Sequence, residues 1–192
     1  MSKIDSFRGE YHFLSNFYET PVCVYGIKYP NAEAAFQAQK CVLPEEAEAF
    51  KTMSPQMAKR YGRMVQLKPN WEQIKDSVML TVVRAKFKNP VLKDLLLNTG
   101  AAELIEGNRW GDTYWGVCNG KGKNRLGEIL MTVRTEIHDE LLTRLYKQTV
   151  DILSIMTSEQ PIGVGQESEL VAVLLKTKDV LECDGISYPD EI

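Results

Sequence analysis

Residues 114–127 read YWGVCNGKGKNRLG, a glycine- and lysine-rich loop that continues directly into a helix. Its four glycines allow sharp turns and a close approach of the backbone to a ligand. Lys121, Lys123 and Arg125 add positive charge, and Asn124 is expected to cap the helix that follows. Such a cap would direct free backbone N–H groups and the positive end of the helix dipole toward an anion. The stretch therefore predicts a phosphate-binding loop, and the alternative is a mobile basic loop on the surface.

Two common nucleotide-binding motifs do not fit this loop. It contains no GxxxxGK[ST] sequence, and Gly120-Lys121-Gly122 lacks the third glycine that a GxGxxG motif requires. The residues therefore argue against nucleoside triphosphate hydrolysis and against a Rossmann dinucleotide site.

The segment before the loop, residues 108–116, reads NRWGDTYWG and places Asp112 between Trp110 and Trp115. Desolvation among aromatic rings can raise the pKa of a carboxyl group, which suits a proton donor. The rings also offer stacking surfaces for a flat base. The alternative is an aspartate that makes a local turn beside two core tryptophans, and the residues alone weigh the two interpretations equally.

Further upstream, residues 32–43 predict a helix that Asn31 caps. Glu33, Gln37 and Lys40 recur at i, i+4 and i+7, so they share one face of that helix. A solvated polar stripe is the common explanation of such a face, but the surrounding alanines favour a buried helix. Because a buried carboxylate needs a functional reason or a partner, Glu33 is a candidate catalytic group.

The rest of the chain predicts an α+β fold, a single compact domain that is mainly helical with short strands. Aromatic and β-branched residues between positions 7 and 29 indicate short strands, and caps and apolar periodicity indicate further helices. Trp71 follows the expected cap Asn70, where it either anchors its helix in the core or stacks on a ligand. The domain is predicted to cover residues 1–155, with residues 156–192 as a C-terminal extension packed on it. The further helices are expected at residues 45–53, 55–62, 71–87, 90–100 and 125–155.

Composition narrows the function. At 192 residues the chain has the length of one domain, and its net charge of −3 argues against a protein that coats nucleic acid. No apolar run approaches the roughly 20 residues of a membrane span, and the N-terminus lacks the apolar core of a signal peptide, so we expect a cytoplasmic protein without a membrane partner. Four scattered cysteines and two distant histidines offer neither a disulfide scaffold nor a metal site or a Ser-His-Asp triad. Carboxylates are therefore expected to carry any acid–base chemistry, without a metal or another cofactor.

Short motifs follow one another along residues 7–138: Leu14-Ser15-Asn16-Phe17, Glu33 with Phe36-Gln37-Ala38-Gln39-Lys40, Asn70-Trp71-Glu72, Ala85-Lys86-Phe87, Leu104-Ile105-Glu106, Asp112 with Tyr114-Trp115-Gly116, and Asn119 through Gly127. In this order, and continued by Leu130-Met131 and Arg134, they resemble the YbiA-like, or NADAR, family. The resemblance implies a compact α+β fold around a ligand cleft. It also implies hydrolysis of an N-glycosidic bond.

Two substrate classes are associated with that family, and in both a ribose is joined to an exocyclic amine of a pyrimidine or guanine-like ring. One class is the phosphoribosylamino-pyrimidine intermediates of riboflavin synthesis, a small-molecule phosphorylated ribosyl substrate, and the other is ADP-ribosylated guanine of nucleic acid. By resemblance, Glu33, Trp71 and Asp112 are expected to be catalytic or to line the active site. The positions expected to bind substrate are Ser15, Asn16, Phe17, Gln37, Lys40, Lys86, Trp115, Gly116, Gly120, Lys121, Gly122, Lys123 and Asn124.

The resulting hypothesis is an oxocarbenium-like transition state in which one acid protonates the departing amine and a carboxylate activates water. Glu33 is expected to be the main acid–base residue, with Asp112 steadying the developing positive charge or the ribose hydroxyls. Which acid plays which part stays open at this point. An alternative of another class is a non-catalytic sensor that binds ADP-ribose or a related nucleotide, although unpaired carboxylates beside an anionic ligand would weaken such binding.

Overall fold

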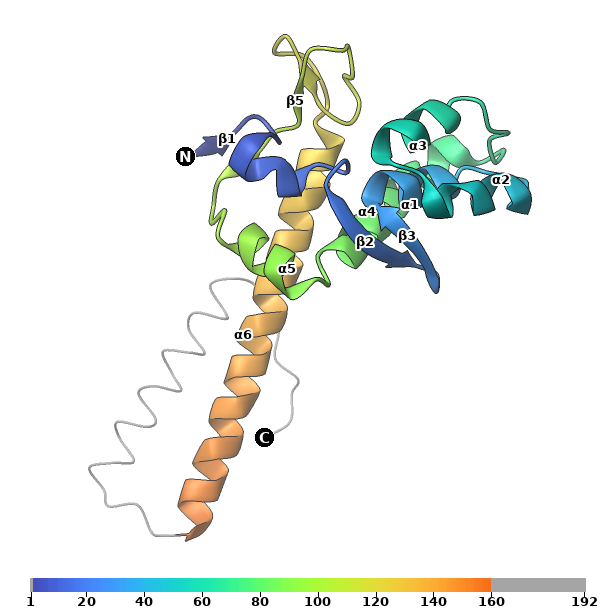
Figure 1. The fold of residues 1–192 in the computed structure, drawn as a ribbon. Coiled ribbons are helices and arrows are strands. Elements are labelled where there is room, and N and C mark those ends of the chain that lie inside the picture. Colours follow the sequence, from blue (N-terminus) through green and yellow to red (C-terminus); the bar gives the residue numbers. More distant parts are fainter. Residues whose placement is uncertain (1, 160–192) are drawn as a thin grey trace. The chain divides into compact units, whose positions relative to one another are not determined.

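The computed structural model describes residues 2–159 of the chain (Figure 1). The chain divides into two compact units, the N-terminal unit (Met1–Arg134) and the C-terminal unit (Thr135–Ile192). The strands and the first five α-helices of the described residues belong to the N-terminal unit, and the last helix begins in it.

The described residues are mainly helical, with three two-stranded sheets. β2 and β3 form an antiparallel hairpin, whereas β1 pairs with β4, and β5 with β6, in parallel. The predicted α+β class with short strands is therefore confirmed. The strands are β1 (Lys3–Ile4), β2 (Glu19–Val24), β3 (Ile27–Asn31), β4 (Glu103–Leu104), β5 (Gly107–Asn108) and β6 (Val117–Cys118). The helices are α1 (Ala32–Ala38), α2 (Pro44–Ala49), α3 (Pro55–Tyr61), α4 (Trp71–Lys86), α5 (Pro90–Leu97), α6 (Arg125–Glu159), and the 3₁₀ helices η1 (Gly9–Leu14) and η2 (Phe50–Thr52).

Side-chain caps explain where several helices begin. The Asn31 side chain accepts a hydrogen bond from the backbone N–H of Ala34 at 2.8 Å, which starts α1 as predicted. Ser54 caps α3 and Asn89 caps α5 in the same way, and each is followed by a proline at the first helical position.

Two predicted caps are wrong. Asn70 makes no capping bond to α4, and its φ of −99° and ψ of 19° differ from the extended backbone of a capping residue. Asn124 has a φ of +53°, and its side chain bonds to the backbone of residues 104 and 106 rather than to the first turn of α6. Its Oδ1 accepts a bond from the N–H of Glu106, and its Nδ2 donates to the carbonyl of Leu104.

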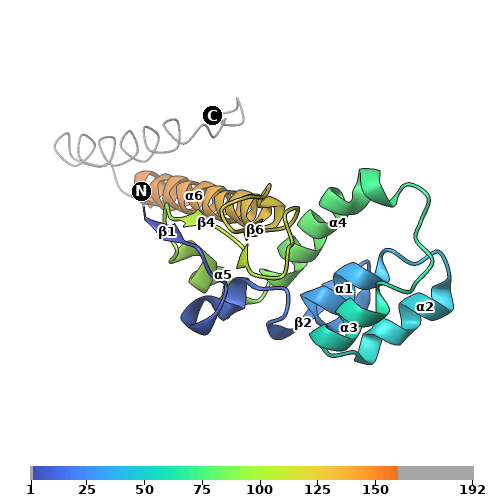
Figure 2. The ribbon, with the colours of Figure 1, turned by 90° about the horizontal axis from the view of Figure 1, so that it is seen from above.

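Helix α1 is the buried centre of this part of the fold. All its residues are buried, and it contacts β2, β3, α3 and α4; Figure 2 shows it beside α3. The prediction of a buried helix is confirmed, and the solvated polar stripe is excluded. The helix ends at Ala38 rather than at residue 43 because Cys41 forms a β-bridge with Leu67.

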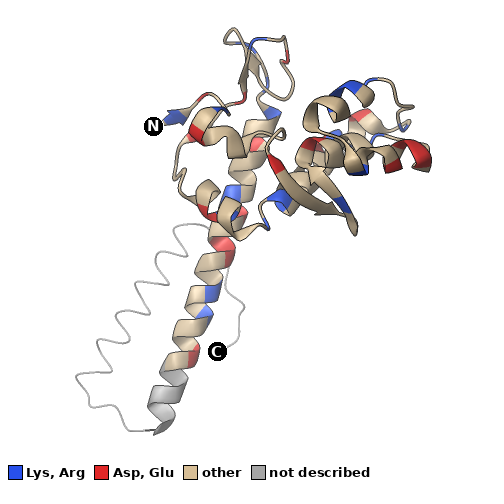
Figure 3. Ribbon diagram, viewed as in Figure 1, with Lys and Arg blue, Asp and Glu red and all other residues tan. Residues whose placement is uncertain are grey.

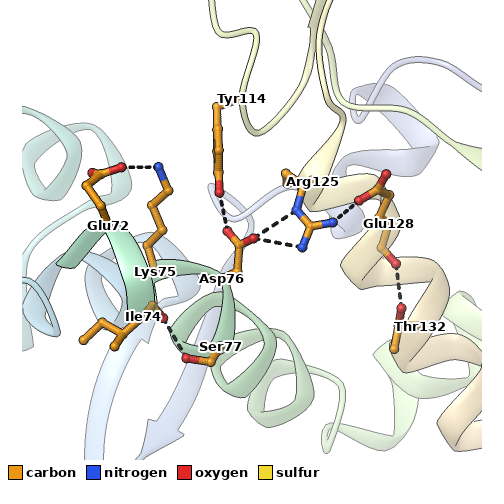
Figure 4. Close-up of polar contacts among 9 residues, drawn as sticks. All are labelled: Glu72, Ile74, Lys75, Asp76, Ser77, Tyr114, Arg125, Glu128 and Thr132. Atoms are coloured by element: carbon orange, nitrogen blue, oxygen red, sulfur yellow. Dashed lines mark hydrogen bonds and ion pairs between the residues drawn. The ribbon is translucent and has the colours of Figure 1, made fainter. Parts of the chain in front are cut away.

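Asp76 on α4 connects two segments that are distant in sequence (Figure 4). Its Oδ1 accepts a hydrogen bond from the hydroxyl of Tyr114 at 2.8 Å. Its Oδ2 accepts from Nε and Nη2 of Arg125 at 3.0 and 2.8 Å, and Arg125 also pairs with Glu128 one turn along α6. The ammonium of Lys75 lies 3.6 Å from the centre of the Tyr114 ring. These bonds join α4 to the loop and to the first turn of α6.

Replacing Asp76 by alanine is expected to lower the free energy of unfolding by about 1–2 kcal/mol, because a charge-assisted, two-pronged contact is lost. Urea denaturation followed by circular dichroism measures the change. Glu72→Ala on the same helix is the matched control, since its exposed ion pair with Lys75 is worth about 0.5 kcal/mol or less. Equal effects of the two substitutions would contradict this role of Asp76.

The C-terminal unit is described only for the part of α6 that ends at Glu159. The predicted extension, residues 156–192, lies almost wholly outside the described residues, and its packing on the domain stays a prediction. Among the helices that the structure describes, none has both the length and the apolar character needed to cross a membrane.

Candidate active site

A pocket of about 660 Å³ opens in the N-terminal unit, a size suited to a nucleotide-sized ligand. Its wall combines segments that are far apart in the sequence. Its charged residues are Arg8, Glu33, Lys40, Lys59, Arg63, Glu106 and Asp112, and its aromatic residues other than histidine are Phe7, Phe17, Phe36, Trp110 and Trp115.

Glu33 reaches the pocket from the first turn of α1 and is 5% exposed. The side-chain Nε2 of Gln37, one turn later, donates a hydrogen bond to its Oε1 at 2.7 Å. Burial raises the pKa of the Glu33 carboxyl, while Lys59, the bond from Gln37 and Lys40 oppose that shift. The predicted face of Glu33, Gln37 and Lys40 therefore lines the pocket as a unit.

Asp112 lies in a turn that its own side chain organises. Its Oδ1 accepts hydrogen bonds from the backbone N–H groups of Tyr114 and Trp115 at 3.1 and 2.9 Å. The Asn108 side chain holds the other side of the turn, donating to the Asp112 carbonyl and accepting from the Asp112 N–H. Asp112 also lines the pocket. The local turn is therefore present, although Trp110 beside it is exposed rather than in the core, and a role of Asp112 as proton donor stays a prediction.

An aromatic wall surrounds Phe36 on α1. The ring centres of Trp71 and Trp115 lie 5.3 and 5.4 Å from that of Phe36. Trp115 lines the pocket, whereas Trp71 is buried behind Phe36 and is not among the lining residues. Trp71 therefore anchors α4 in the core, and a direct contact of Trp71 with substrate stays a prediction.

Four cations line the pocket, and three of them, Arg8, Lys59 and Arg63, were missed by the sequence reasoning. The Lys59 ammonium lies 5.6 and 5.9 Å from the ring centres of Phe17 and Trp110. Burial lowers the pKa of Lys40, while the nearby Glu33 opposes the shift. Figure 3 shows basic and acidic residues interspersed along the described ribbon. The pocket gathers four of the basic residues on a chain of net charge −3.

Most of the glycine–lysine loop lies outside this pocket. Lys121, Gly122 and Lys123 are exposed and are absent from its lining. Gly120 lines an adjoining pocket of about 420 Å³, which shares two residues with the first. The loop as a phosphate cradle therefore stays a prediction.

Gly116 and Asn124 have a structural task, and their predicted contact with substrate stays a prediction. A Cβ atom added to Gly116 would lie 2.1 Å from the carbonyl oxygen of Glu106, so no larger residue fits there without a backbone shift. Asn124 binds the N–H of Glu106 on the other side. Both residues hold the backbone around Glu106.

The predicted tripeptide Ser15, Asn16 and Phe17 lines the pocket. Asn16 donates from Nδ2 to the Met79 sulfur at 3.2 Å, and its Oδ1 is buried without a hydrogen-bond partner among the described residues. Lys86, also predicted to bind substrate, is not in the lining. It is 1% exposed and donates to the Ser15 carbonyl at 2.7 Å, so it holds the backbone of this loop. Burial lowers the pKa of Lys86 to about 7, and the charge of Glu106 opposes the shift.

Glu106 is the fourth charged residue of the pocket that the site prediction omitted. A signal was present, since Glu106 ends the Leu104-Ile105-Glu106 motif of the resemblance. No sequence signal identified Arg8, Lys59 and Arg63, because they belong to no recognised motif. Within the residues that the structure describes, no group of three or more His, Cys, Asp or Glu side chains could hold a metal ion.

Three carboxyl groups, an aromatic wall and four cations surround one pocket, a combination that can serve acid–base chemistry and the binding of a charged ligand. Residues 5–138 match the NADAR domain family, and the chain belongs to that family.

Similar proteins agree with this assignment. N-glycosidase YbiA of Shigella flexneri serotype 5b is 42% identical over 133 residues, which cover 67% of this chain and 82% of that protein. A riboflavin biosynthesis protein of Vibrio vulnificus is 36% identical over 132 residues, 66% of this chain and 36% of its own. The NMR structure of E. coli YbiA matches with a TM-score of 0.67 at 40% identity, covering 73% of this chain and 88% of that one. The prediction of a NADAR-family enzyme of the N-glycosidase type is confirmed at the level of the family.

Proposed function

We propose that this protein hydrolyses the N-glycosidic bond between ribose C1 and an exocyclic amine of a pyrimidine or guanine-like base. One observation carries the proposal: the buried carboxyl group of Glu33 lines the same pocket as an aromatic wall and a set of cations. Each part of such a substrate has a counterpart there. The flat ring would lie against Trp115, the phosphate near Lys40 and Lys59, and ribose C1 close to the carboxyl groups.

The reaction passes through an oxocarbenium-like state at C1, by analogy with the cleavage of O-glycosides. Glu33 is the main acid–base residue, and its burial makes proton exchange possible nearer to neutral pH than for an ordinary glutamate. Asp112 faces the same space, where its negative charge would stabilise the positive charge that develops on the ribose.

Of the two substrate classes, we favour a phosphoribosylamino-pyrimidine. The similarity to a protein named for riboflavin biosynthesis supports this choice. Removal of ADP-ribose from guanine in nucleic acid is the second candidate, supported by the adjoining pocket, which offers space and Arg109 to a longer anionic ligand. We also propose that the protein acts in the cytoplasm.

The test is direct incubation of the protein with a ribosylaminopyrimidine phosphate and, separately, with guanine-ADP-ribosylated DNA. Chromatography would detect the free base and the released sugar. Cleavage of the first substrate supports the proposal, and cleavage of only the second selects the alternative. Cleavage of neither, together with tight binding of ADP-ribose in calorimetry, would identify a sensor instead.

The pocket cations and the loop lysines can be separated by substitution. Lys59→Ala is expected to raise KM about tenfold or more, because a charge-assisted bond to phosphate is lost. Lys59→Arg keeps the charge and should raise KM less. Lys121→Ala and Lys123→Ala test the loop lysines separately, and a larger rise of KM in these two variants would show that the loop, rather than Lys59, binds the phosphate.

A further inference from the structure

Glu106 joins β4 to β5, and its side chain lines the pocket together with Glu33 and Asp112. Its Oε2 is buried and has no hydrogen-bond partner among the described residues. Buried polar atoms are nearly always satisfied, and an exception calls for an explanation. Because this oxygen has almost no accessible surface, neither water nor a described protein donor stabilises a negative charge on it, which favours the neutral form of the carboxyl group.

The backbone around Glu106 is held on both sides by residues 116–124. Its N–H donates to Oδ1 of Asn124 at 3.0 Å, and its carbonyl accepts from the N–H of Val117 at 2.9 Å. Gly116 lies so close that an added Cβ would stand 2.1 Å from this carbonyl and 3.0 Å from Cγ of Glu106. The glycine-rich stretch thus positions a carboxyl group at the pocket.

The surroundings of Glu106 disfavour its ionised form. Burial raises the pKa of Glu106 to about 7, and Asp112 adds to the rise, while Lys59, Arg8 and Lys86 oppose it. These groups come from α3, α4, the start of η1 and the Asp112 turn. The remaining charged groups of the pocket are Glu33, Lys40 and Arg63.

Glu33 and Glu106 differ in the hydrogen bonds that their carboxyl groups accept. Glu33 receives a hydrogen bond from the Gln37 amide at 2.7 Å, and such a donor favours the carboxylate form. No donor among the described residues meets Oε2 of Glu106. Of these two glutamates, Glu106 is therefore the one better suited to hold a proton, and Glu33 the one better suited to accept one.

We propose that Glu106 is a further catalytic residue, the acid that protonates the departing amine, while Glu33 takes the proton of the attacking water. This inference rests on the proposed N-glycosidase function. The bond between C1 and the amine nitrogen breaks with its electron pair on nitrogen, which takes the proton of Glu106. The water oxygen then bonds to C1 as Glu33 accepts its proton. The products are the free amine and the ribose with a C1 hydroxyl, and exchange with solvent returns both glutamates to their starting states.

The test is the pH dependence of kcat for the full chain with a ribosylaminopyrimidine phosphate as substrate. In the wild type, kcat should fall above about pH 7, as Glu106 loses its proton. Glu106→Gln should lower kcat about a hundredfold or more and remove this alkaline fall. Glu106→Asp should retain the fall at a reduced rate. Glu103→Gln, an exposed glutamate of neighbouring β4, is the matched control and should match the wild type.

A second measurement separates chemistry from structure. Because the acid assists the leaving group, the loss in Glu106→Gln should shrink for a substrate whose departing amine is less basic. An unchanged kcat or a retained alkaline fall in Glu106→Gln would overturn the assignment while the N-glycosidase function stands. If Glu106→Gln fails to fold, absence of the alkaline fall in the wild type and Glu106→Asp would overturn it. A wild type that cleaves neither substrate class would instead refute the proposed function.

Discussion

Glu33→Gln is expected to lower kcat by about a hundredfold or more, because glutamine cannot exchange a proton with water or with the leaving group. The substitution keeps the shape of the side chain, and the Gln37 amide can still donate to its oxygen. Steady-state kinetics with a ribosylaminopyrimidine phosphate measures the change. Glu45→Gln, an exposed glutamate in the first turn of α2, is the matched control. Near-normal turnover in Glu33→Gln would remove Glu33 from the mechanism.

The same substitution should increase stability at neutral and alkaline pH. Burial raises the pKa of Glu33 in the folded state, so the folded chain binds its proton more tightly than the unfolded chain does. The free energy of unfolding of the wild type therefore falls as pH rises from the ordinary glutamate pKa through the raised one, and stays lower above it. Glu33→Gln removes this contribution. Thermal unfolding at pH 5 and pH 8 should show a gain in Tm for the variant that is larger at pH 8.

Asp112→Asn is expected to lower kcat by about a hundredfold, because the negative charge that faces the developing oxocarbenium ion is lost. The asparagine retains Oδ1, so the hydrogen bonds from the N–H groups of Tyr114 and Trp115 persist. Its melting temperature should stay close to that of the wild type.

Asp112→Ala is the informative partner of that variant. It loses the same charge and both hydrogen bonds of the turn, so it should also lose about 1–2 kcal/mol of stability. Full activity in Asp112→Asn with lowered stability in Asp112→Ala would show that Asp112 only shapes the turn.

Local patterns predicted the surroundings of Glu33 well. The cap at Asn31 and the repeat of Glu33, Gln37 and Lys40 along a helix are short-range features, set by backbone geometry within a few residues. The alanines between them indicated close packing, and the helix is fully buried. Its end was misplaced because the Cys41–Leu67 bridge depends on a segment more than twenty residues away.

The partner of the glycine-rich stretch could not be predicted from its residues alone. A glycine permits close approach of any partner, whether a phosphate or another backbone. At Gly116 that partner is the carbonyl of Glu106, and at Gly127 it is the carbonyl of Leu104. The side chain of Asn124 likewise binds the backbone of residues 104 and 106 rather than capping α6. The glycines predicted that another group approaches this stretch closely, but they did not distinguish a phosphate from the backbone of residues 104 and 106.

The sequence by itself determined the helices and their starts at Asn31, Ser54 and Asn89, the buried face of α1, and, through its ordered motifs, the family. Only the tertiary structure decided that Arg8, Lys59 and Glu106 share a pocket with Glu33. The physical reason is the distance along the sequence over which each kind of interaction acts. Caps and periodicity act over one or two helical turns, whereas the pocket depends on how elements pack across the fold. That packing places carboxyl groups 73 positions apart in the chain at one cavity.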